Sequence, residues 1–141
     1  MKNAYTPDEP VAAIATALAP AALGIVRTSG KDCIELVAKM FSRPEALKKA
    51  AGNTIVYGWI IRPDGSRVDE VLASVFRAPK SFTGEDMVEI SCHGGPAVVT
   101  AVHKLLLAGG FRQAQPGEYT FRAYINGKTD LTKAEAVREI I

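Results

Sequence analysis

The feature that most constrains the fold is a pair of strand-like runs joined by a tight-turn signal. Residues 53–61 and 68–76 are both rich in β-branched and aromatic side chains, and Asp64-Gly65 lies between them. An Asp-Gly pair tolerates the positive φ angles that a short hairpin turn requires. The two runs are therefore predicted to form an antiparallel hairpin, which commits this part of the chain to a β-sheet.

Further strands and helices surround the hairpin without regular alternation. Short strands are predicted at residues 25–26 and 87–93, and helices at residues 32–41 and 96–108. A parallel sheet would need strands and helices in strict alternation, which the sequence lacks. The fold class predicted is therefore α+β, with a small mixed sheet and helices packed against it.

Helix boundaries can be read from capping residues. Ser29 or Asp32 is expected to cap the first helix, and Pro44 to stop it. Pro96 suits the first position of the second helix, where its missing N–H costs least, and Gly109-Gly110 end that helix. The adjacent Lys48 and Lys49 are expected at a solvated helix end.

The last residues predict a new element. Thr132 and Glu135 form a capping box that begins a helix, and no stop signal follows before Ile141. We therefore expect a longer protein, in which residues 1–120 form one domain. Residues 121–141 would be a connection and the start of the next domain.

Composition excludes several classes of protein. The 141 residues carry a net charge of +2 with no basic stripe, which argues against binding nucleic acid or anionic lipid directly. The apolar residues 11–26 are too few for a membrane span, and they follow acidic residues, unlike a signal peptide. Cys33 and Cys92 lie in apolar surroundings, which fits a reducing, cytoplasmic compartment. Cys92-His93 and His103 fall short of the roughly four ligands of a zinc site, so no metal is predicted.

The run Gly127-Lys128-Thr129 looks like half of a phosphate-binding loop. A P-loop needs another glycine five residues before Gly127, where the backbone must approach the phosphates closely. Arg122 occupies that position. The run is therefore not predicted to bind nucleotide, and Lys128 alone reads as a solvated lysine in the turn that Asn126-Gly127 would form.

Two charged residues stand among apolar neighbours in predicted strands. Glu89 and Arg27 could each be an ordinary exposed residue or part of a small-molecule site. Gly94-Gly95 before the second helix could expose amides to an anion, or could simply allow a tight turn. No Ser-His-Asp or Cys-His arrangement is supported, so these residues alone leave the chemistry open.

Four segments together, in this order and spacing, resemble a known family. They are "GIVRTSG", "VDEVLASVF", "SFTGEDMVEISCHGGPAVV" and "PGEYTFRAYINGKTDLTKAEAV". They resemble the N-terminal domain of the MnmE (TrmE) tRNA-modification GTPases. The resemblance implies a fold related to the folate-binding fold of the glycine-cleavage aminomethyltransferases. It also implies a homodimer and binding of a tetrahydrofolate derivative such as 5-formyltetrahydrofolate.

The same resemblance implies the function of the longer protein. It would act with the flavoprotein MnmG on the wobble uridine of certain tRNAs, using a one-carbon unit from tetrahydrofolate. GTP, potassium and magnesium would bind in a G domain outside this chain, so the chain alone is not expected to catalyse. The family's folate contacts fall on Arg27, Glu89 and Lys128. A strand-held carboxylate suits the donor edge of a pterin, and the two cations suit a carbonyl, a formyl oxygen or the glutamate tail.

The first loop departs from the family pattern. This chain has "ALAPAALGI" where the family usually has the glycine-rich "PPGRGGIGI", and threonine replaces the usual leucine in "GKTDL". The lost glycines remove positions that could approach a ligand or take positive φ. Two hypotheses follow: a folate-binding, dimerising domain, or an assembly module that has lost folate binding.

Overall fold

The fold is a six-stranded mixed sheet with helices packed against it, which confirms the α+β prediction. The computed structural model describes residues 8–18, 23–128 and 130, and the helix predicted from Thr132 lies outside them. The strands are β1 (Val11–Ile14), β2 (Gly24–Ser29), β3 (Thr54–Ile61), β4 (Arg67–Phe76), β5 (Met87–Cys92) and β6 (Arg112–Gln113). The helices are α1 (Cys33–Ala38), α2 (Pro44–Lys49), α3 (Pro96–Ala108) and α4 (Glu118–Ile125).

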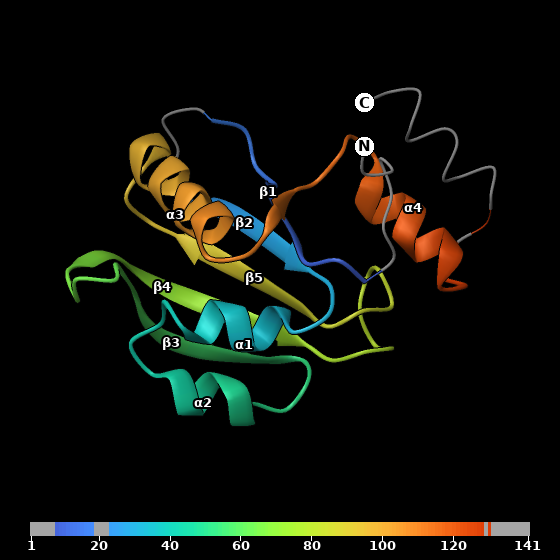
Figure 1. Cartoon of the computed structure of the whole chain (residues 1–141), viewed down its shortest axis with the longest axis horizontal. Coiled ribbons are helices and arrows are strands. Elements are labelled where there is room, and N and C mark those ends of the chain that lie inside the picture. The colour runs from blue at the N-terminus through green and yellow to red at the C-terminus, as the bar shows by residue number, and fades with distance from the viewer. Residues whose placement is uncertain (1–7, 19–22, 129, 131–141) are drawn as a thin grey trace.

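The strand order in the sheet is β3-β4-β5-β2-β1-β6. Neighbours are antiparallel except for the pair β1 and β6, which is parallel. Figure 1 shows α1 and α3 against the sheet, α2 beside the edge strand β3, and α4 apart from them at the right of the view. The predicted hairpin is confirmed as β3 and β4, and Asp64 accepts hydrogen bonds from the Ser66 backbone N–H and hydroxyl in its turn.

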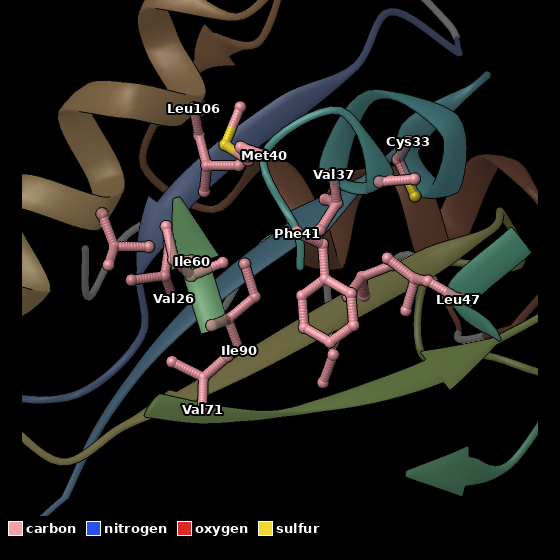
Figure 2. Packing of buried hydrophobic residues seen from close by; sticks show 14 of the residues in the cluster. Val26, Cys33, Val37, Met40, Phe41, Leu47, Ile60, Val71, Ile90 and Leu106 are labelled. Atoms are coloured by element: carbon pink, nitrogen blue, oxygen red, sulfur yellow. The ribbon is translucent and has the colours of Figure 1, made fainter. Parts of the chain in front are cut away.

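One face of the sheet carries the hydrophobic core. Val26, Ile90 and Ala73 lie opposite one another in register on β2, β5 and β4, and all three are buried. Figure 2 shows such side chains meeting residues of α1, α2 and α3, including Val37, Leu47 and Leu106. The alternation of β-strand side chains then puts the odd-numbered neighbours of Val26 and Ile90, such as Arg27 and Glu89, on the opposite face.

A close approach between Phe41 and Gly58 in the core depends on glycine. The ring of Phe41 lies against Gly58 of β3, where an added Cβ would come within 2.4 Å of Phe41 Cζ. Phe41 itself is buried and bridges to Ile60. This contact packs the segment after α1 flat against β3.

Several boundaries differ from the sequence prediction. Asp32 occupies the N-cap position of α1 with a left-handed φ of 62° and makes no side-chain capping bond. Ser29 does not cap it either, because its hydroxyl is bonded to Thr83 and Glu85. The prediction that Pro44 stops the first helix is wrong, because α1 already ends at Ala38 with Lys39 as its C-cap. Pro44 instead begins α2, whose last turn carries Lys48 and Lys49. The predicted domain division at residue 120 falls within α4 and stays a prediction.

Candidate functional site

The structure brings Arg27 and Glu89 together as an ion pair. They are register partners on β2 and β5, and Arg27 Nε donates to Glu89 Oε2 at 2.7 Å. Both side chains are partly exposed. Among the described residues, neither the Nη atoms of Arg27 nor Oε1 of Glu89 has a hydrogen-bond partner. The pair therefore keeps donors and an acceptor available for a ligand.

Two aromatic rings contact the Arg27 guanidinium. The rings of Phe82 and Tyr119 each have their centroid 5.5 Å from Arg27 Cζ, a distance suited to cation–π attraction. Phe82 comes from the loop before β5, and Tyr119 from the first turn of α4. The Tyr119 hydroxyl also donates to the Arg27 carbonyl at 2.7 Å. Burial raises the pKa of Tyr119, so its hydroxyl stays protonated as that donor.

A cavity opens beside Arg27. Its volume is about 690 Å³, and its walls are Arg27, Tyr119 and residues 13–15 and 112–117. Most of this lining is apolar, which is typical of small-molecule pockets of this size. Glu89 and Lys128 are not among the lining residues, so Arg27 alone of the predicted set faces this cavity.

A buried ionic network lies behind the cavity. Arg122 is 0% exposed; its Nη1 donates to Glu85 at 3.0 and 3.2 Å, and its Nε donates to Glu118 at 3.0 Å. Glu118 also accepts two hydrogen bonds from Arg112, which pairs in turn with Glu9. Unpaired buried charges would be very costly, and this arrangement pairs each one.

The network favours the charged forms of Glu118 and Arg112. Burial opposes ionisation of Glu118, but hydrogen bonds from Arg112 and the Gln115 N–H, together with Arg122, hold its pKa below the ordinary value. The hydrogen bonds to Glu118 raise the pKa of Arg112, against the effect of its own burial. Sequence reasoning noted Arg122 only as a misfit in a P-loop. Glu118 and Arg122 lie four residues apart, a spacing at which opposite charges on a helix can pair, so this contact could have been predicted from the sequence.

Lys128 lies beside the loop that carries Phe82. Lys128 follows α4, and its backbone N–H donates to the carbonyl oxygen of Ala123 in that helix. Its Cγ would be 3.4 Å from a Cβ added at Gly84. The side chain is exposed, and no described contact joins it to Arg27 or Glu89. The structure thus pairs two predicted site residues and leaves the third one loop away. Arg122 lies in α4, so the position where a P-loop would have its first glycine is helical.

The remaining candidates have structural explanations. A Cβ at Gly94 would come within 2.4 Å of Val98, and Gly95 has a φ of 88°, so the turn into α3 accounts for both glycines. Burial raises the pKa of Cys92 to about 12, and that of Cys33 further, which keeps both thiols protonated. Within the described part of the chain, no group of acidic, His and Cys residues is arranged to hold a metal. No described helix is long and apolar enough to cross a membrane.

Comparison with known proteins assigns the family. The profile of the GTP-binding protein TrmE N-terminus matches residues 10–128. The chain is 59% identical to a tRNA modification GTPase MnmE of Treponema denticola, over 97% of this chain and 29% of that protein. It is 45% identical to the MnmE of Borrelia turicatae, over 100% of this chain and 31% of the relative. The chain thus spans less than a third of these relatives, and it belongs to the family of TrmE N-terminal domains.

Proposed function

We propose that this chain is the tetrahydrofolate-binding part of a tRNA-modification GTPase, with Arg27 and Glu89 at the centre of the folate site. The observation that carries the proposal is the Arg27–Glu89 pair, in register at 2.7 Å, with donors and an acceptor that no described residue engages. The names of the longer relatives support the tRNA-modification role. Potassium, magnesium and GTP would be bound by a G domain outside this chain.

The residues present fit a reduced folate in chemistry. A pterin offers N–H donors next to a carbonyl, which match the free carboxylate oxygen of Glu89 and the Nη donors of Arg27. The apolar cavity beside Arg27 suits the uncharged, flat part of such a ligand, and Lys128 would supply a cation for an anionic or formyl group. When bound, 5-formyltetrahydrofolate supplies the one-carbon unit. The chain's own residues bind and orient it.

The tRNA substrate and the protein partners follow from the family proposal. The full-length protein would act with the flavoprotein MnmG on the wobble uridine of tRNA, with GTP hydrolysis driving its conformational cycle. This chain contributes binding and assembly rather than catalysis.

An exposed apolar surface supports pairing with a second copy. Ile55 is 65% exposed on β3, and the register partners Tyr57 and Leu72 are exposed beside it on β3 and β4. Grouped apolar side chains on the surface of a soluble domain mark an interface. We propose that two chains associate through this surface by a two-fold contact. A Leu72→Asp variant would then sediment as a monomer, whereas an unchanged sedimentation coefficient would remove this surface from the interface.

Calorimetric titration with 5-formyltetrahydrofolate tests the folate proposal. The chain should bind it, and Glu89→Gln, which keeps the shape but removes the charge, should weaken binding by at least about tenfold because a charged hydrogen bond is lost. Glu45→Gln, an exposed carboxylate on α2, is the matched control and should bind normally. Absence of binding by the folded, unsubstituted chain would favour the alternative, a dimer-assembly module without folate.

A further inference from the structure

The orientation of Arg27 is not explained by its ion pair alone. One hydrogen bond through Nε leaves a long, partly exposed arginine side chain with much of its rotamer freedom. A ligand that accepts from the Nη atoms needs the guanidinium plane held in one direction beforehand, because ordering it on binding costs affinity. Phe82 and Tyr119, here called the aromatic pair, are the described residues whose rings contact that plane.

We propose that the aromatic pair positions Arg27 for ligand binding, a role that rests on the proposed folate site. Each ring lies 5.5 Å from Arg27 Cζ, so both favour one orientation of the guanidinium. Tyr119 does more, because its hydroxyl holds the Arg27 carbonyl at 2.7 Å. The backbone and the side chain of Arg27 are thus fixed by the same residue.

The buried network sets the distance between the two members of the aromatic pair. Phe82 precedes Thr83 and Glu85 in its loop, and Tyr119 follows Glu118 in α4. Arg122 joins Glu85 to Glu118, which ties the loop to the helix through charges that solvent does not reach. A second tie runs from Asn126 Nδ2 to the Thr83 carbonyl at 2.9 Å. Arg122 does not line the cavity, so it acts on the site through the aromatic pair.

Phe82 offers the cleanest test, because it is 53% exposed and its replacement should leave the fold intact. Phe82→Leu removes the ring, whereas Phe82→Tyr keeps it. We expect Phe82→Leu to weaken binding of 5-formyltetrahydrofolate by about two- to fivefold, in line with an exposed cation–π contact, and Phe82→Tyr to restore it. The thermal midpoint of both variants should equal that of the unsubstituted chain.

A ligand-free measurement separates this proposal from the folate proposal. The Nε–Hε resonance of Arg27, assigned with Arg27→Lys, should carry a ring-current shift that falls in Phe82→Leu and persists in Phe82→Tyr. An unchanged resonance in Phe82→Leu would overturn the positioning role, and so would a changed resonance with unaltered folate affinity. If the unsubstituted chain binds no folate but the resonance behaves as expected, the folate proposal fails and the positioning of Arg27 stands.

Discussion

The hydrophobic core and the candidate site are held together by different interactions. On the helix-covered face, apolar side chains of α1, α2 and α3 pack on β-strand residues such as Val26 and Ile90 (Figure 2). Next to Arg27, α4 and the loop before β5 are joined by Arg122, Glu85 and Glu118, all of them buried. Apolar packing is non-directional and its stabilisation scales with the area buried, whereas a buried ionic network is stable only when every charged group has its partner. The directional network lies at the candidate site, where side chains must be aimed.

The largest effect should come from breaking the network at its centre. Arg122→Met leaves Glu85 buried without the cation that pairs with it and leaves Glu118 with Arg112 alone, which should cost about 3–5 kcal/mol of unfolding free energy. Arg62→Met, a change at an exposed turn arginine, should stay within about 0.5 kcal/mol. Urea unfolding followed by circular dichroism measures both, and a cost below about 1 kcal/mol for Arg122→Met would show that the network is dispensable.

A smaller effect should come from overpacking the apolar face. Gly58→Ala puts a methyl group into the Phe41 ring and should cost about 1–3 kcal/mol. Gly52→Ala, whose new Cβ would meet its nearest neighbour at an ordinary 3.4 Å, is the matched control. In a Phe41→Leu background the added cost of Gly58→Ala should shrink, because the two positions touch. Additive costs in that double-mutant cycle would contradict the contact.

The smallest effect should be a pH dependence of stability that comes from Glu118 in the buried network. Because the pKa of Glu118 is lowered in the folded chain, the unfolded chain takes up this proton first as the pH falls. The stability contributed by Glu118 is therefore complete above about pH 4.5 and is lost as the pH drops through the folded-state pKa. Unfolding free energies measured between pH 7 and pH 3 should fall less steeply for Glu118→Gln. Parallel curves for the two proteins would refute this contribution.

The sequence predicted the elements whose signals are local. The hairpin of β3 and β4, strand β5 and helix α3 were each predicted from a periodic run of residues, and the hairpin and α3 also from the turn, proline or glycine residues at their ends. Strands β1 and β6 were missed, because β1 is short and alanine-rich and β6 has two residues. Both are strands only through their neighbours in the sheet.

The candidate site was predicted unevenly for a similar reason. Arg27 and Glu89 stood out as charged residues in predicted strands, and the family resemblance assigned them to folate. Their pairing depends on a register between residues 62 positions apart. Phe82 and Tyr119 were not singled out, since a lone aromatic residue in a sequence says nothing about which cation it will meet. The partnership of Arg122 with Glu85, 37 positions away, left no periodic pattern to detect.

The pairing of β2 with β5 has a consequence for the order in which the chain folds. The hairpin β3–β4 closes a short loop, while β2 and β5 join across a long one that includes α1, α2 and that hairpin. Long closures lose more chain entropy and are slower. Arg27 and Glu89 face each other across this late contact, so the site is assembled only when the sheet is complete. A ligand of that pair binds the finished domain alone and should raise its melting temperature in proportion to the logarithm of ligand concentration.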